Sequence, residues 1–199
     1  MLLDLAWLIG VLTLGLLSPG PDFLLLVKNS VGGNRARALG TALGISSGLA
    51  VHMTIISLGF AALDAQKLRV VQFIGVALLA WIGLRALLAP RRDAESPPTA
   101  RAARGAFLQG LVCNATNPKA LAFFVGVFAQ VIPPGASLGW RIALPVIIVV
   151  HGVLCWTLIV AALQSPLVSR RLERVQHGLP RVFGAVLVVL AVVLLVENV

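Results

Sequence analysis

The sequence predicts an all-α integral membrane protein that crosses the bilayer about six times. Hydrophobic residues make up 59% of the 199-residue chain and charged residues only 12%, whereas a soluble domain contains about 25% charged residues. The mean hydropathy is +0.99. The apolar residues are also gathered into runs of about 20 residues, the length that a helix needs to cross the hydrocarbon core. We therefore expect a single transmembrane domain over residues 1–199.

Six apolar segments can be placed, at about residues 5–27, 38–63, 70–88, 105–132, 142–163 and 178–196. The second and the fifth contain no Asp, Glu, Lys or Arg. Proline lacks a backbone N–H and clashes with the preceding helical turn, so the Ser-Pro-Gly-Pro run at 18–21 and Asn117-Pro118 should break the first and fourth segments. We expect a half-helix to begin at each break, with Ser18 and Asn117 as N-caps and a proline in the first helical position.

The two halves of the chain share a pattern that predicts an inverted repeat. Each half begins with a proline-broken segment and carries a histidine in its second segment: His52 stands 31 residues after Pro21, and His151 stands 33 residues after Pro118. Three segments per half is an odd number, so the halves would insert in opposite orientations. Transporters of this kind bind substrate at the repeat interface, between the interrupted helices. We expect repeat one at about 1–89, a cytoplasmic linker at about 90–104 and repeat two at about 105–199.

The basic residues predict the orientation in the membrane. The gaps after the first, third and fifth segments hold ten Lys and Arg residues, and Arg85 and Arg181 at the adjoining segment ends make twelve, whereas the gaps after the second and fourth hold three. Cytoplasmic loops carry an excess of basic residues, so the odd-numbered loops should be cytoplasmic and both termini outside. The net charge of +9 then indicates orientation and contact with anionic lipid rather than binding of nucleic acid.

Asp22 and Lys119 each directly follow the proline of a break. A charge within the bilayer is costly unless it faces a cavity or a partner, so we expect these two side chains to meet, directly or through water. Asp22 can then hold a substrate ammonium or the coupling proton, and Lys119 can hold a carboxylate. The alternative is that Asp22 only complements the dipole of its half-helix, while Lys119 extends to the membrane surface.

Further polar residues in the apolar segments extend this candidate site. His52 and His151 are candidates for a proton relay, because imidazole titrates near neutral pH. The alternative for each is a packing histidine bonded to a neighbouring carbonyl. Asn114 and Asn117 closely precede Pro118 and can line the same cavity.

Glycines in the second segment predict a structural role instead. Gly40, Gly44 and Gly48 recur at every fourth position, which places them on one face of a helix. Small residues in this spacing let two membrane helices approach closely. We expect this face to pack against another segment.

Several classes of function find no support in the sequence. It carries no nucleotide-binding, hydrolase or HExxH motif, so we expect neither an enzyme nor a cofactor, and any work must come from an ion gradient or the solute's own gradient. A divalent metal-ion exporter is an alternative, although no motif places two ligands on one helix face and no resident metal is expected. A thiol-electron conductor is a weaker alternative, because Cys113 and Cys155 are not at matching repeat positions. The expected partners are a small solute and lipid, with no nucleic acid, and the sequence leaves self-association open.

Two runs of residues resemble the signatures of the LysE/RhtB family of amino-acid exporters. They are Ser18-Pro-Gly-Pro-Asp-Phe-Leu-Leu-Leu-Val-Lys-Asn-Ser30 and Phe107–Ala120, and the resemblance extends over essentially the whole chain. It implies export of amino acids or their derivatives across the bacterial inner membrane, driven by the proton motive force. The residues to which it points are Gly20, Pro21, Asp22, Asn114, Asn117, Pro118 and Lys119. The chain departs from the family at Leu78, where the family has Tyr, and the resemblance does not specify the amino acid.

Overall fold

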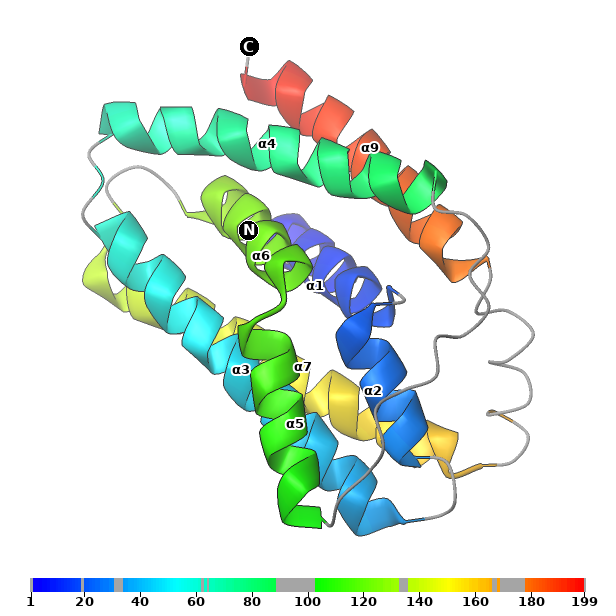
Figure 1. The fold of residues 1–199 in the computed structure, drawn as a ribbon. Coiled ribbons are helices and arrows are strands. Elements are labelled where there is room, and N and C mark those ends of the chain that lie inside the picture. The colour runs from blue at the N-terminus through cyan, green and yellow to red at the C-terminus, as the bar shows by residue number, and fades with distance from the viewer. Residues whose placement is uncertain are drawn as a thin grey trace.

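The computed structural model describes residues 2–18, 20–30, 34–61, 63, 65–88, 103–132, 136–165, 168 and 178–198. Within these residues every element of regular structure is a helix (Figure 1). The helices are α1 (Leu2–Leu17), α2 (Pro21–Ser30), α3 (Arg35–Ala61), α4 (Ala65–Leu88), α5 (Ala103–Ala115), α6 (Pro118–Val131), α7 (Leu138–Leu163) and α9 (Leu179–Asn198). The predicted linker at 90–104 lies outside the described residues except for its last two, which begin α5.

All six predicted apolar segments are helical. Helices α3, α4 and α7 are each long and apolar enough to cross a membrane. Helices α1 and α2 form a further apolar pair bent by 66°, and α5 and α6 form a second pair bent by 58°. With each bent pair counted as one span, the described chain has up to five spans by length and composition, and α9 is the sixth predicted segment. The prediction of an all-α membrane protein with broken first and fourth helices is confirmed.

Large apolar side chains cover the outward faces of the long helices. Leu58 of α3 is 70% exposed and Leu158 of α7 is 68% exposed. Leu84 of α4 and Val189 of α9 are exposed in the same way. A soluble monomer rarely exposes contiguous apolar surface of this extent, whereas lipid tails cover it in a membrane.

The second break forms as its sequence predicts. Asn117 has extended backbone angles, and its side-chain oxygen accepts hydrogen bonds from the backbone N–H groups of Lys119, at 3.0 Å, and Ala120, at 3.4 Å. Pro118 occupies the first turn of α6, where a backbone N–H would have no partner within that helix. Asn117 is therefore the N-cap of a half-helix that begins inside the apolar segment.

The first break departs from the prediction that Ser18 caps a helix beginning at Pro19. Helix α2 begins at Pro21, and the carbonyl of Gly20 accepts its first hydrogen bond, from Leu24 N at 2.9 Å. A helix starting at Pro19 would need Gly20 in a helical conformation, and a residue that precedes a proline avoids that conformation. Ser18 instead belongs to the end of α1, where its N–H donates to Gly15 O at 3.3 Å.

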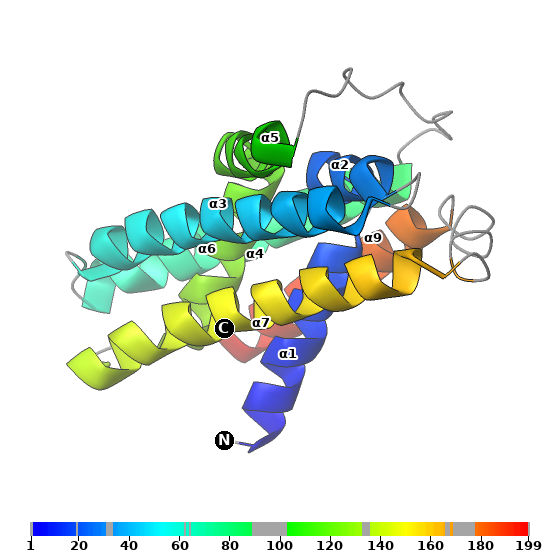
Figure 2. The same ribbon diagram turned by 90° about the horizontal axis from the view of Figure 1, so that it is seen from below.

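The helices form two closely packed groups. Helix α3 packs along α5 and α7, and α4 packs along α9 and α6 (Figures 1 and 2). The predicted glycine face of α3 lies against α5 at Gly44 and Gly48. A Cβ added at Gly44 would collide with the carbonyl of Phe107, and one added at Gly48 would lie 2.7 Å from Asn114 Cβ. Close packing through these two glycines is confirmed.

Candidate functional site

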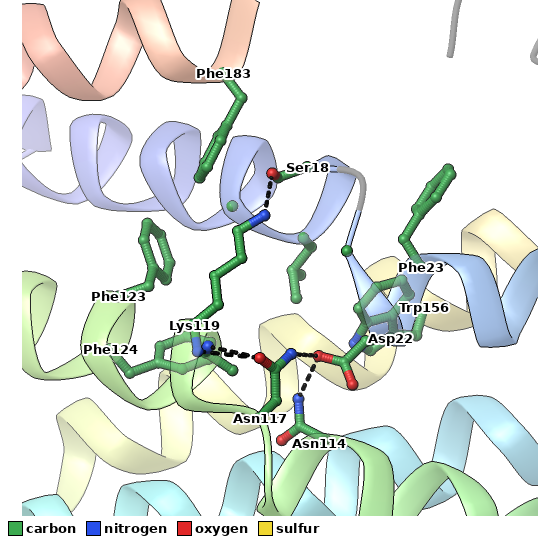
Figure 3. A pocket seen from close by; sticks show the side chains of 14 residues that line it. Ser18, Asp22, Phe23, Asn114, Asn117, Lys119, Phe123, Phe124, Trp156 and Phe183 are labelled. Atoms are coloured by element: carbon green, nitrogen blue, oxygen red, sulfur yellow. Dashed lines mark hydrogen bonds between the residues drawn. The ribbon is translucent and has the colours of Figure 1, made fainter. Parts of the chain in front are cut away.

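The two breaks meet at one cavity. It has a volume of about 40 Å³, and Figure 3 shows the side chains that line it. They come from α1, α2, α5, α6, α7 and α9. The lining residues are Gly15, Leu16, Ser18, Gly20, Asp22, Phe23, Asn114, Asn117, Lys119, Ala120, Phe123, Phe124, Trp156 and Phe183.

Asp22 supplies the acidic group of this cavity. It lies in the first turn of α2 and is 9% exposed. Its Oδ2 accepts hydrogen bonds from Asn114 Nδ2 at 3.0 Å and from Asn117 Nδ2 at 2.8 Å (Figure 3). Its Oδ1 is buried and has no hydrogen-bond partner among the residues that the structure describes. The carboxylate is thus fixed through one oxygen and keeps the other as an available acceptor.

Asn117 links the carboxylate to the second break. Its Nδ2 donates to Asp22, while its Oδ1 caps α6. The nitrogen and the oxygen of the Asn117 amide are therefore both hydrogen-bonded, and these bonds fix the orientation of the amide. This connects the start of α6 to the start of α2 across the cavity.

Lys119 supplies the basic group. Its Nζ donates to Ser18 Oγ at 2.7 Å and lies 5.1 Å from the centre of the Phe183 ring (Figure 3). Asp22 and Lys119 both line this cavity, but whereas the sequence predicts that they meet, directly or through water, the ammonium bonds to Ser18 and the carboxylate bonds to two asparagine amides (Figure 3). Their separate partners leave the two charges at different places along the cavity wall.

The two histidines occupy different environments. His52 Nε2 lies 2.8 Å from the carbonyl oxygen of Asn114, so His52 adjoins the cavity through that residue. His151 Nε2 lies 3.0 Å from Thr13 Oγ1 and 3.3 Å from Cys155 Sγ, between α1 and α7. The geometry of His52 matches the alternative of a packing histidine bonded to a carbonyl. A proton relay through either ring stays a prediction.

The remaining predicted residues shape the site through the backbone. Gly20 lines the cavity next to Lys119: a Cβ added there would lie 3.4 Å from the ammonium nitrogen. Pro21 and Pro118 begin α2 and α6, so they set the two breaks from which Asp22 and Lys119 extend.

Aromatic walls are the feature that the sequence did not predict. Phe123 and Phe124 of α6 pack edge to face with ring centres 5.3 Å apart, and Phe183 approaches from α9. Trp156 of α7 is 2% exposed, and its indole N–H has no acceptor among the described residues. Nothing distinguishes these residues from lipid-facing or core aromatics in an apolar sequence.

The described residues contain no group of three His, Cys, Asp or Glu side chains placed to hold a metal ion. Cys113 and Cys155 lie on different helices, α5 and α7, and neither is in a disulfide. Cys155 Sγ lies 3.3 Å from His151 Nε2, and Cys113 lies beside Asp22, so each cysteine has a different neighbour. These contacts supply no geometric support for the metal or thiol alternatives.

Comparison with known proteins identifies the family. The family model described as LysE type translocator matches residues 13–198. The chain is 31% identical to the threonine efflux protein of Salmonella typhimurium over 181 residues, covering 85% of this chain and 86% of that protein. It is 31% identical to the leucine efflux protein of Klebsiella pneumoniae over 138 residues, covering 67% of this chain and 65% of that protein. No solved structure matches the chain. The resemblance found in the sequence is confirmed, and the chain belongs to the LysE type translocator family.

Proposed function

We propose that this protein exports neutral amino acids across the bacterial inner membrane in exchange for protons. The observation that carries the proposal is the placement of one acidic and one basic side chain on the wall of the same cavity, at two helix breaks. A charge inside a membrane protein usually marks a substrate or ion pathway. The similar proteins named as threonine and leucine efflux proteins support an amino-acid substrate.

The cavity offers complementary groups to both ends of an amino acid. Asp22 Oδ1, which has no hydrogen-bond partner within the described part of the chain, can accept from the substrate ammonium. The Lys119 ammonium, with the Ser18 hydroxyl beside it, can bind the substrate carboxylate. The N-terminus of α6 adds its positive dipole end on the same side as Lys119.

The rest of the lining indicates a substrate with an uncharged side chain. Asp22 and Lys119 are the charged members of the lining, and the zwitterion uses both. The other large groups are Phe and Trp rings, and a substrate cation or anion placed among them would lack a buried counter-charge. Threonine and leucine, which name two of the similar efflux proteins, both have uncharged side chains.

The cavity must widen before a substrate binds. Its volume of about 40 Å³ accommodates a few water molecules, whereas small-molecule pockets are typically about 300–1,000 Å³. The two breaks lack continuous helical hydrogen bonds, so the half-helices can shift there at the lowest cost. We infer that the structure is a closed form of a transporter that opens at its breaks.

The same carboxylate can couple transport of the amino acid to movement of a proton. Asp22 can bind either a proton or a substrate ammonium at Oδ1, and this competition is the minimal requirement for exchange of one for the other. Two neutral amides hold Oδ2 in this structure and leave Oδ1 for either ligand. His52 and His151 stay candidates for carrying the proton onward.

Helix directions support the proposed inverted repeat. Helix α3 packs against its counterpart α7, and α4 packs against its counterpart α9. In each pair the two helices run in opposite directions (Figures 1 and 2), as opposite insertion of the two halves requires. Repeat one would comprise about 1–89 and repeat two about 105–199, forming one domain.

The ends of the helices support the proposed orientation. The C-terminal ends of α2, α4 and α7 and the N-terminal ends of α3 and α9 lie toward the right in Figure 2, and these ends flank the basic-rich gaps. Most of the helix ends that flank the basic-rich gaps therefore lie toward one end of the described molecule. By the excess of basic residues in cytoplasmic loops, that end is cytoplasmic and both termini are outside.

Transport by the purified protein in proteoliposomes tests the proposed function. Labelled threonine, leucine, lysine and glutamate are each supplied with and without a pH gradient. We expect gradient-dependent movement of threonine or leucine and none of lysine or glutamate. Movement of lysine at the same rate would refute the neutral substrate class, and movement of no amino acid by correctly folded protein would refute amino-acid export.

A further inference from the structure

The break before α6 leaves one backbone carbonyl without its helical donor. In a continuous helix the carbonyl of Asn114 would accept from the N–H of residue 118, but residue 118 is a proline and has none. Two other donors bond to the Asn114 carbonyl instead. Asn117 N lies 2.9 Å from Asn114 O, and His52 Nε2 lies 2.8 Å from the same oxygen. Helix α3 thus supplies a cap to the end of α5.

Helix α3 holds Asn114 at two points. His52 bonds to its carbonyl. One turn earlier on the same face, Gly48 lies so close that an added Cβ would be 2.7 Å from Asn114 Cβ and 2.9 Å from its Oδ1. Gly48 therefore leaves room for the side chain that His52 fixes through the backbone. Both His52, at 3% exposure, and Asn114, at 4%, are buried.

The side chain held in this way bonds to the candidate binding group. Asn114 Nδ2 donates to Asp22 Oδ2 at 3.0 Å. The path from His52 to the carboxylate therefore passes through one residue, by two hydrogen bonds. A movement of the Asn114 backbone would move the amide that orients Asp22.

His52 takes part in this path as a hydrogen-bond donor. A carbonyl oxygen can only accept, so Nε2 must carry the hydrogen in the bond to Asn114. The other ring nitrogen, Nδ1, is buried without a partner in the described chain. The contact with Asn114 therefore needs a donor at this position and needs no change of protonation.

We propose that His52 is a positioning residue for substrate binding: together with Asn117 N it caps the Asn114 carbonyl, which has no helical donor at Pro118, and through Asn114 it holds the Asp22 carboxylate in the cavity. The proposal rests on the proposed function, because it takes Asp22 as the group that binds the substrate ammonium. It assigns His52 a role through neighbouring residues, without contact with the substrate.

Three variants in α3 test the proposal. His52→Gln keeps an N–H donor at a similar distance from the backbone, and His52→Leu keeps the volume without a donor. Thr54→Val is the matched control, since Thr54 is exposed and its hydroxyl donates to Ala50 O of its own helix. Each variant is assayed for transport of threonine or leucine, whichever the wild type moves faster, and for amide hydrogen exchange around the α5–α6 break.

We expect His52→Leu to raise KM about tenfold, with a smaller effect on the maximal rate, and to speed hydrogen exchange at the break. His52→Gln should restore both values and the wild-type pH profile, and Thr54→Val should match the wild type. Wild-type KM and wild-type exchange in His52→Leu would overturn the proposal.

A second result would also overturn it. If His52→Gln lost the response to a pH gradient while still exchanging labelled for unlabelled amino acid, His52 would carry the proton and not only position Asn114. A wild type that moves no amino acid would refute the proposed export instead. In that case, faster hydrogen exchange in His52→Leu but not in His52→Gln would still support capping by His52.

Discussion

Asn117 Nδ2 donates to Asp22 Oδ2 at 2.8 Å, which joins two residues 95 positions apart. The same Asn117 side chain caps the first turn of α6 through its oxygen. A ligand that binds to Asp22 therefore acts on the group that begins α6. If Asp22 binds the substrate as proposed, substrate binding and the geometry of the second break are coupled through a single amide.

Substitution of Asn117 separates these two roles. Asn117→Ser retains an N-cap oxygen but is too short to reach Asp22, and Asn117→Ala loses both interactions. We expect both variants to raise KM for the transported amino acid by about tenfold, because each removes a hydrogen bond to a charged group. Only Asn117→Ala should also lose about 1 kcal/mol of stability from the missing cap. Transport kinetics and thermal unfolding in detergent measure the two effects, and wild-type values of both in Asn117→Ala would contradict this assignment.

A pair of glycines in α3 tests the close contact with α5. Gly44→Ala places a methyl group against the carbonyl of Phe107 and 2.9 Å from Leu111 N. Overpacking of this kind costs about 1–3 kcal/mol, so the unfolding temperature should fall. Gly59→Ala is the matched control on the same helix, because no atom lies within 4 Å of its added Cβ. Equal unfolding temperatures for the two variants would show that α3 and α5 do not pack as described.

Lys119 should determine recognition of the substrate carboxylate. Lys119→Met keeps most of the side-chain length and removes the charge that bonds to Ser18. We expect the rate of transport at low substrate concentration to fall at least about tenfold, as for loss of a charged hydrogen bond. Competition by the methyl ester of the substrate, which lacks the carboxylate charge, provides the specific readout. The wild type should prefer the free amino acid to the ester, and Lys119→Met should not; an unchanged preference would place the carboxylate elsewhere.

The sequence predicts the helices and their breaks because both depend on local properties. Hydropathy runs locate the spans, and proline locates an interruption within a few residues. The start of α2 at Pro21 was missed, because two prolines two residues apart compete and the choice depends on the conformation of Gly20 between them. The cap by Asn117 was predicted, because its partners are its own neighbours in the chain.

Contacts between distant segments could not be predicted in the same way. The partners of Asp22 lie 92 and 95 residues away, and the partner of Lys119 lies 101 residues away. The sequence placed both charges at one interface by the repeat, but it could not choose between a direct contact and separate partners. The aromatic wall was missed because Phe and Trp are ordinary residues in any apolar helix.

Proton-driven accumulation by Asp22 variants tests the central claim most directly. In inside-out vesicles acidified within, export corresponds to uptake of labelled threonine or leucine. We predict that the wild type accumulates one of these against its gradient and that Asp22→Asn, checked for folding by thermal unfolding, accumulates neither and no longer responds to the pH gradient. Gradient-driven accumulation by Asp22→Asn at the wild-type rate would contradict the assignment of substrate and proton binding to this carboxylate.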